Sequence, residues 1–185
     1  MKIPAHSKRV FQGVLFDIYQ WEQKMYDGSQ QTFEMAKRKP SVGVIAVVEN
    51  KILILEQEQP LKQPYPALPG GGVEVGQDHL QAAEEELLQE TGYKAVEIKL
   101  LTESFGGTKM YSHQSVFVGK NCQKVAEQKL DPGEKIIIKF IGFNDFLQLC
   151  RQESFAVPLG FRFMMYEALV DSEKKERLEK EIFEK

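Results

Sequence analysis

Cysteine is scarce in this sequence: only Cys122 and Cys150 occur, far apart and outside any CxxC pair. A disulfide-stapled scaffold and a cysteine-ligated zinc module are therefore excluded. We expect both residues to be reduced thiols with a structural role.

Long apolar runs and an excess of charge of one sign are also missing. No stretch is long enough to span a bilayer and the start shows no signal-peptide pattern, so we expect no membrane partner and a cytoplasmic location. A net charge of −3 gives no electrostatic footprint for nucleic acid, and we expect no nucleic-acid partner. The 185 residues, 42% of them hydrophobic, suit one domain with an adequate core.

Several catalytic signatures are absent as well. The chain has no GxxxxGKS/T phosphate loop, no HExxH zinc helix and no GxSxG nucleophile elbow. The glycine cluster Gly70–Gly72 lacks the third glycine of a GxGxxG loop at its proper place. These absences argue against a P-loop nucleotide-binding site, a GxGxxG dinucleotide-binding loop, a zinc protease and a serine hydrolase.

What the chain does have is a glycine-rich bend followed by a strong helix signal. Gly70–Gly72 leads into Leu80 to Glu90, where Leu, Ala, Glu and Gln dominate. Asp78 is placed to cap the start of this helix, and Gly92 to end it in a left-handed conformation. The unit is predicted to be loop, helix and loop.

The predicted helix places carboxylates together. Glu86 and Glu90 lie about 40° apart around the helix, with Gln89 beside them. Like charges at this spacing repel, and a bound divalent cation would turn that cost into a gain. Oxygen ligands of this kind suit Mg²⁺ or Mn²⁺. The residues expected to face the core are Leu80, Ala83, Leu87 and Leu88.

At these residues the stretch resembles the Nudix box, the Gly, Glu, Arg-Glu and Glu-Glu-x-Gly signature of the Nudix pyrophosphohydrolases. Gly71 matches the leading glycine, Glu86 and Glu90 match two of the glutamates, and Gly92 with Tyr93 matches the closing pair. Three positions depart from the pattern: Gln77 and Gln89 replace glutamates, and Glu85 replaces the arginine. The resemblance implies an α/β Nudix fold, a mixed β-sheet sandwiched between helices, with an N-terminal β-hairpin arm.

In layout the chain resembles the ADP-ribose pyrophosphatase branch of that family, in which an N-terminal arm often packs on a second subunit. We expect an arm over residues 1–40 and a Nudix domain with C-terminal helices over 41–185. The arm is predicted as a hairpin of strands Arg9 to Gln20 and Gln31 to Arg38. The aromatic residues of this hairpin are Phe11, Phe16, Tyr19 and Trp21. They need a surface to pack against, which indicates a homodimer; packing on their own domain is the alternative.

The central sheet is predicted from apolar runs. Ser41 to Val48 and Lys51 to Glu56 are expected as strands, and the three prolines of Glu56 to Pro66 indicate a loop. Lys62 is the only cation near the place where related enzymes hold phosphate with arginine, although a solvated loop lysine is the favoured interpretation. Beyond the box, the expected elements are strands Ala95 to Glu103 and Gln114 to Gly119, with a loop between them, Ser104 to His113. His113 is expected to be a surface residue, with a role on the substrate as the alternative.

The last part of the chain supplies a further carboxylate. Leu130 to Phe143 is a turn followed by an apolar strand, and Glu134 stands where they meet, either as a site residue or as a plain strand-entry glutamate. Asn144 is expected to cap a helix from Asp145 to Arg151. Two more helices are expected, one from Pro158 through Val170 and a charged one from Asp171 to Lys185.

The resemblance implies a site and a reaction. Glu86 and Glu90 would hold the metal with the Gly70 carbonyl and the neutral amide oxygen of Gln89. Glu134 would act as general base or bind a further metal, and the substrate would contact Gly71, Gly72 and Lys62.

The expected reaction is metal-dependent hydrolysis of a nucleoside diphosphate linked to another moiety, ADP-ribose or a nucleotide sugar, to two monophosphates. The altered box predicts weak or metal-demanding catalysis. The alternative is a catalytically impaired Nudix domain that binds a nucleotide as a regulator or scaffold.

Overall fold

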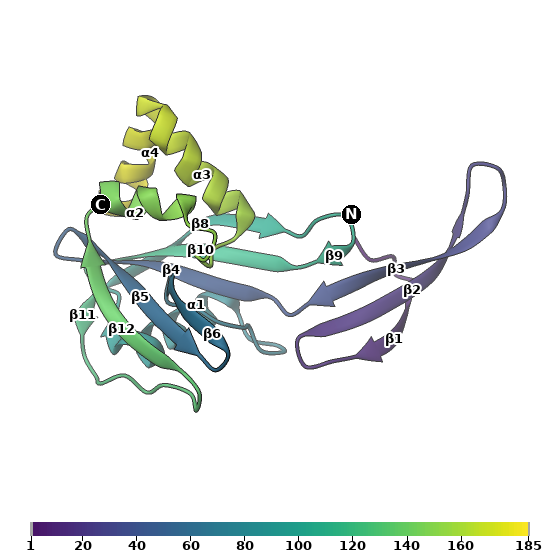
Figure 1. Cartoon of the computed structure of the whole chain (residues 1–185), viewed down its shortest axis with the longest axis horizontal. Helices are drawn as coiled ribbons and strands as arrows, with labels where there is room; N and C mark the ends of the chain where they lie inside the picture. Colours follow the sequence, from purple (N-terminus) through teal and green to yellow (C-terminus); the bar gives the residue numbers. More distant parts are fainter. Residues whose placement is uncertain (1, 185) are drawn as a thin grey trace.

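A mixed sheet forms the centre of the molecule, and its strands run in the order β12-β5-β4-β10-β8, with β6 paired to β5 (Figure 1). The computed structural model describes residues 2–184. β10 runs parallel to β4, while the other pairs are antiparallel. The strands are β4 Ser41–Val48, β5 Lys51–Gln59, β6 Lys62–Ala67, β8 Glu97–Phe105, β10 His113–Lys120 and β12 Lys135–Ile141.

Helices cover both faces of this sheet, so the predicted sandwich is confirmed (Figure 1). One face carries α1, and the other carries the remaining helices and the short 3-10 turn η1. Alternation along β4 explains the two layers, since Val44 and Ala46 face α1 whereas Ile45 and Val47 face the opposite side. The bounds are α1 His79–Thr91, α2 Phe143–Gln148, η1 Leu149–Arg151, α3 Leu159–Val170 and α4 Ser172–Phe183.

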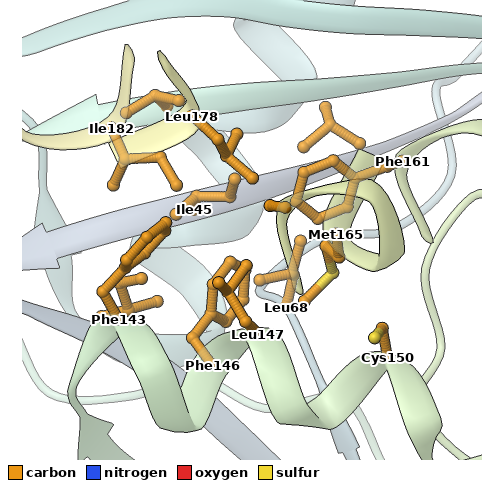
Figure 2. Close-up of a cluster of buried hydrophobic side chains, with 14 of the residues drawn as sticks. Ile45, Leu68, Phe143, Phe146, Leu147, Cys150, Phe161, Met165, Leu178 and Ile182 are labelled. Atoms are coloured by element: carbon orange, nitrogen blue, oxygen red, sulfur yellow. The ribbon is translucent and has the colours of Figure 1, made fainter. Parts of the chain in front are cut away.

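The larger core cluster lies between the sheet and the C-terminal helices (Figure 2). Phe146 on α2, Phe161 on α3 and Ile182 on α4 are all fully buried there. The chain therefore needs its C-terminal helices to cover the sheet, although α4 is highly charged along its solvent side. The free thiols Cys122 and Cys150 are buried, as expected for structural residues.

The segment predicted as a proline-rich loop is instead a hairpin. β5 continues to Gln59, the chain turns at Pro60 and Leu61, and β6 returns antiparallel to β5. Pro64 and Pro66 are two residues apart, so their nitrogens lie on the same side of β6. β6 is an edge strand, and no neighbouring strand on that side requires an N–H donor. The loop prediction was wrong because the three prolines were interpreted as a loop signal, whereas an edge strand also tolerates proline.

Two helix details also differ from prediction. α2 begins at Phe143 behind Gly142, not behind Asn144, because Phe143 and Phe146 are drawn into the core directly after β12 ends. On α1, Leu80 and Leu88 remain 39% and 38% exposed, and Ala82 is buried in their place.

The other predicted helices are confirmed. α3 follows Pro158 and ends at Val170, and α4 begins after Asp171, whose side chain caps it. The predicted end of the last helix at Lys185 lies outside the described residues. No helix within residues 2–184 is both long enough and apolar enough to cross a membrane.

The N-terminal arm is a four-stranded sheet of order β1-β2-β3-β9 that extends from the domain (Figure 1). The hairpin of β2 and β3 matches the prediction, but the predicted first strand is broken at Gly13 into β1 and β2. β9 comes from the predicted loop before β10 and runs parallel to β3. Trp21 and Met35 are buried in this arm. Its strands are β1 Lys8–Gln12, β2 Phe16–Lys24, β3 Gln30–Arg38 and β9 Met110–Tyr111.

A small two-stranded sheet completes the fold. It pairs β7 Tyr93–Lys94 with β11 Gln123–Lys124. The pair begins one residue after Gly92, and the amides of Val125 and Ala126 donate to the Gly92 carbonyl. The end of α1 is thereby tied to the segment that leads toward β12.

Candidate active site

Helix α1 is fixed at both ends by the residues predicted to cap it. The Asp78 carboxylate accepts hydrogen bonds from the amides of Leu80 at 2.8 Å and Gln81 at 3.4 Å. Gly92 has a φ of 73° and donates its amide proton to the Leu88 carbonyl at 2.8 Å. These caps set where the helix begins and ends, and with it the direction of its carboxylates.

Glu90 is the more buried of the two helix carboxylates, with 3% of its surface exposed. Its Oε2 accepts a hydrogen bond of 2.7 Å from the Gly70 amide. A Cβ at Gly70 would lie 2.2 Å from the Val42 carbonyl oxygen, so the close approach of this bend to β4 requires glycine. Gly70 is therefore joined to Glu90 through its N–H, and its predicted role as a carbonyl ligand stays a prediction.

Glu86 lies directly over Gly71. A Cβ on Gly71 would be 2.1 Å from Oε1 of Glu86, so the missing side chain is what leaves room for this carboxylate. The bend is held in place by β4, because the Val42 amide donates to the Gly71 carbonyl at 3.0 Å. Gly72 forms an antiparallel bridge with Ser41, and its Cα faces open space.

Four carboxylates are gathered at this bend. Burial, together with the smaller effects of the charges of Glu134, Asp131 and Glu85 in that order, raises the pKa of Glu86 to about 7. The pKa of Glu90 is raised to about 8, first by burial and then by the charges of Glu86, Glu134 and Asp131, against the opposing effect of the Gly70 N–H. Acids that raise one another's pKa while buried form a donor set that suits a hard divalent cation.

Glu134 is oriented by residues that the sequence did not single out. Gln57 donates through Nε2 to Oε1 of Glu134 at 3.3 Å, and the Tyr65 hydroxyl donates to Oε1 of Gln57 at 2.9 Å. The exposed Lys62 places its Nζ 3.4 Å from the centre of the Tyr65 ring. Gln57 and Tyr65 were missed because their segment was predicted as a loop. Both are buried positions on β5 and β6, and the alternation of inward and outward residues along these strands was the signal that could have identified them.

Two glutamines and an aspartate complete the surroundings of Glu90. Gln89 donates through Nε2 to Oδ1 of Asp131 at 3.3 Å, so its amide faces the turn that precedes Glu134. Gln128 donates through Nε2 to the Glu90 carbonyl at 2.7 Å. Asp131 lies three residues before Glu134, and its charge acts on both helix carboxylates.

The two other altered box positions are in contact with each other. Gln77 donates through Nε2 to Oε2 of Glu85 at 2.8 Å, and Gln81 donates to Oε1 of the same carboxylate at 2.8 Å. Gln77 also accepts a hydrogen bond from the Glu74 amide at 3.0 Å. Glu85 is exposed, so most of its charge is solvated, in line with its angle of about 100° from Glu86.

The fold, the glycine bend and the helix carboxylates together define a class. The family model of the NUDIX domain matches residues 37–158, and the chain belongs to the Nudix family. The predicted resemblance to Nudix pyrophosphohydrolases of the ADP-ribose pyrophosphatase type is thereby confirmed.

Two related proteins are similar to this chain over most of its length. The chain is 28% identical over 149 residues to an ADP-ribose pyrophosphatase of Bacillus subtilis (strain 168), which covers 77% of this chain and 80% of that protein. It is 26% identical over 152 residues to a methanol dehydrogenase activator of Bacillus methanolicus, covering 80% and 82%.

Solved structures agree on the fold. The crystal structure of an ADP compounds hydrolase covers 92% of this chain and 95% of its own, with a TM-score of 0.71 and 15% identity. A NUDIX hydrolase from Nitrosomonas europaea covers 70% and 88%, with a TM-score of 0.54 and 22% identity.

Proposed function

We propose that this chain hydrolyses the diphosphate bond of a nucleoside diphosphate linked to another moiety, ADP-ribose or a nucleotide sugar, in a reaction that requires Mg²⁺ or Mn²⁺. The observation that carries the proposal is the convergence of Glu86, Glu90, Glu134 and Asp131 beside the glycine bend. The name of the Bacillus subtilis relative, 28% identical, supports ADP-ribose as the first substrate to test.

Glu86 and Glu90 would hold the metal, and Gln89 would offer a neutral amide oxygen. When bound, a divalent cation neutralises charge on the diphosphate and makes water a better nucleophile. Gly71 keeps the space in front of Glu86 open. The Gly70 amide holds Glu90 so that its carboxylate stays aimed at the bend.

Glu134 is assigned the role of general base. Water attacks one phosphorus, the bond from that phosphorus to the bridging oxygen breaks, and the proton of the water passes to Glu134. Gln57 fixes the orientation of the Glu134 carboxylate through the hydrogen bond to Oε1. The products are two monophosphates, which for ADP-ribose are AMP and ribose 5-phosphate.

Substrate contacts are assigned to the bend and to β6. Gly71 and Gly72 present backbone without side chains, which allows a diphosphate to approach closely. Lys62 is exposed on β6 and would supply a cation for a phosphate. It is connected to Glu134 by successive contacts through Tyr65 and Gln57.

The test is a direct assay. Purified protein is incubated with ADP-ribose, NADH and nucleoside diphosphate sugars in the presence of Mg²⁺ or Mn²⁺, and monophosphate products are measured. We expect slow turnover that demands high metal concentration, because Gln89 supplies no charge. Turnover of none of these compounds would contradict the proposal.

A second candidate function is nucleotide binding without hydrolysis, as a regulator or scaffold. It is favoured by the loss of charged residues at Gln77 and Gln89, the latter already bonded to Asp131. One relative bears the name of an activator of another enzyme. Saturable binding of a nucleotide without any product would support this candidate.

Replacing Gly71 by alanine is expected to reduce turnover by about 100-fold while the protein still folds. The three atoms nearest to the new Cβ all belong to the carboxylate end of Glu86, a flexible side chain that can rotate away, and displacing a catalytic group by about 1 Å costs this much. Turnover and the circular dichroism spectrum are measured together. Gly142→Ala is the matched control, since a Cβ there has open space; equal losses in both variants would contradict the assigned contact.

The arm over residues 1–40 is proposed to form a homodimer interface. Apolar side chains of β1, the following turn and the start of β2 are 39 to 85% exposed: Val10, Phe11, Val14, Leu15 and Phe16. Phe11→Lys should weaken self-association at least about tenfold, since an aromatic anchor is replaced by a charge. Sedimentation at several concentrations measures this, with Val96→Lys, exposed on the other part of the chain, as control. A monomeric wild-type protein would contradict the interface.

A cytoplasmic location stays a prediction.

A further inference from the structure

A group of side chains of the types that can bind a metal lies away from the glycine bend. The histidine cluster consists of His79, Glu103 and His113, and one ligand atom of each lies within 4.8 Å of the others. His79 opens α1, Glu103 lies on β8 and His113 begins β10. The seven residues from His79 to Glu86 correspond to about 10 Å along the helix, so the two groups are separate.

The side chains of the cluster are already held in place. His113 Nε2 lies 2.7 Å from Oε1 of Glu103, and His79 Nδ1 lies 2.7 Å from the Ser115 hydroxyl oxygen. The Ser115 hydroxyl donates in turn to Oε1 of Glu103 at 3.3 Å. An oxygen partner on the second ring nitrogen is the usual support of a metal-ligating histidine, and Ser115 stands in that position for His79.

Ring packing restricts the cluster further. The rings of His79 and His113 have centroids 4.3 Å apart, and Phe105 stacks on the other side of His113 at 4.6 Å with an interplanar angle of 17°. Two imidazolium rings at this separation would repel each other. Burial lowers the pKa of His79, and the charge of His113 lowers it further, which favours the neutral form that binds metal.

We propose that His79, Glu103 and His113 bind a second divalent ion of the Zn²⁺ class, distinct from the ion expected at Glu86 and Glu90. Two imidazoles and one carboxylate are a typical donor set for zinc, whereas the oxygen donors of the bend suit magnesium. The bound ion joins the first turn of α1 to β8 and β10. The ion therefore fixes the first turn of α1, the helix that carries Glu86 and Glu90, against the sheet.

The site can be tested without any assay of hydrolysis. The untagged Glu86→Gln/Glu90→Gln double variant, which lacks the two helix carboxylates of the bend, is stripped with a chelator and titrated with Zn²⁺ in the presence of excess Mg²⁺. We expect one Zn²⁺ per chain by calorimetry, and a raised melting temperature, because an ion that binds only the folded chain stabilises it. Co²⁺ in place of Zn²⁺ should give the visible absorption of a low-coordinate site.

Variants of the cluster separate ligands from supporting residues. Adding His113→Asn or Glu103→Gln should lower the Zn²⁺ affinity at least about 100-fold, and adding Ser115→Ala about tenfold. His6→Asn is the matched control, because His6 is exposed and outside the cluster; it should leave the affinity unchanged.

The outcomes that overturn the proposal are specific. The metal site is excluded if no Zn²⁺ binds under these conditions, which would leave a hydrogen-bonded histidine pair only. It is equally excluded if the affinity is unchanged in both His113→Asn and Glu103→Gln, with the apo spectra showing folded protein. Because Glu86 and Glu90 are replaced in every sample, either result is independent of whether the chain hydrolyses nucleotides.

Discussion

Glu90→Gln is expected to reduce hydrolysis by about 1000-fold without changing the fold. Glutamine keeps the shape of the side chain, and its amide oxygen can still accept the hydrogen bond from Gly70. It removes a negative charge from the set that would hold the metal, and the charge stabilisation supplied by a metal amounts to several kcal/mol, at about 1.4 kcal/mol for each factor of ten. The measurement is kcat at saturating substrate and metal.

The matched control for this variant is Glu84→Gln. Glu84 lies on the same helix but is exposed, so its loss should leave kcat close to that of the wild type. A Glu90→Gln rate within tenfold of the wild-type rate at both limiting and saturating Mg²⁺ would remove Glu90 from the site. A loss at limiting Mg²⁺ that saturating Mg²⁺ restores would instead assign Glu90 to metal affinity alone.

Free of metal, the protein is expected to become less stable as the pH rises from about 5 to about 8.5. The pKa of Glu90 is raised by burial from 4.5 to about 8, so the folded state binds this proton more tightly than the unfolded chain does. The resulting stabilisation is complete below the ordinary pKa and is lost as the pH rises through the folded one. At about 1.4 kcal/mol for each pKa unit, the free energy of unfolding should fall by roughly 4 kcal/mol, and Glu86 acts in the same direction.

Denaturant unfolding in the presence of a chelator measures this slope. Glu90→Gln should remove the contribution of Glu90, because the amide does not titrate, and the smaller contribution of Glu86 should remain. Mg²⁺ added at pH 8 should restore stability to the wild type, since a cation that binds the ionised carboxylates binds only the folded chain. A stability that is flat between pH 5 and 8.5 in the chelated wild type would contradict the raised pKa of Glu90.

The parts of the site that could be predicted depend on local signals. Asp78 and Gly92 mark the ends of α1, and the helical repeat then places Glu86 and Glu90 on one side. Glu134 was predicted from its place before a strand, and its charge does act on both helix glutamates. The helix inferences needed only neighbouring residues and a known helix geometry, whereas the role of Glu134 was implied by the family resemblance.

The parts that could not be predicted depend on pairing between distant segments. Gln57 contacts Glu134 because β12 pairs with β5, and Tyr65 contacts Gln57 because β6 folds back on β5. His79 and His113 come together from a helix start and a strand start, with no spacing that forms a motif. His113 was predicted as a surface residue, yet it is partly covered between Phe105 and His79.

The contact between Gln77 and Glu85 means that the altered box cannot be repaired one residue at a time. Arginine at position 85 has only donors to offer, so the amide groups of Gln77 and Gln81 would lose their shared acceptor. Glutamate at position 77 alone would instead face the carboxylate of Glu85 at close range. The two positions behave as an epistatic pair, and an engineered return to the family pattern has to exchange both at once.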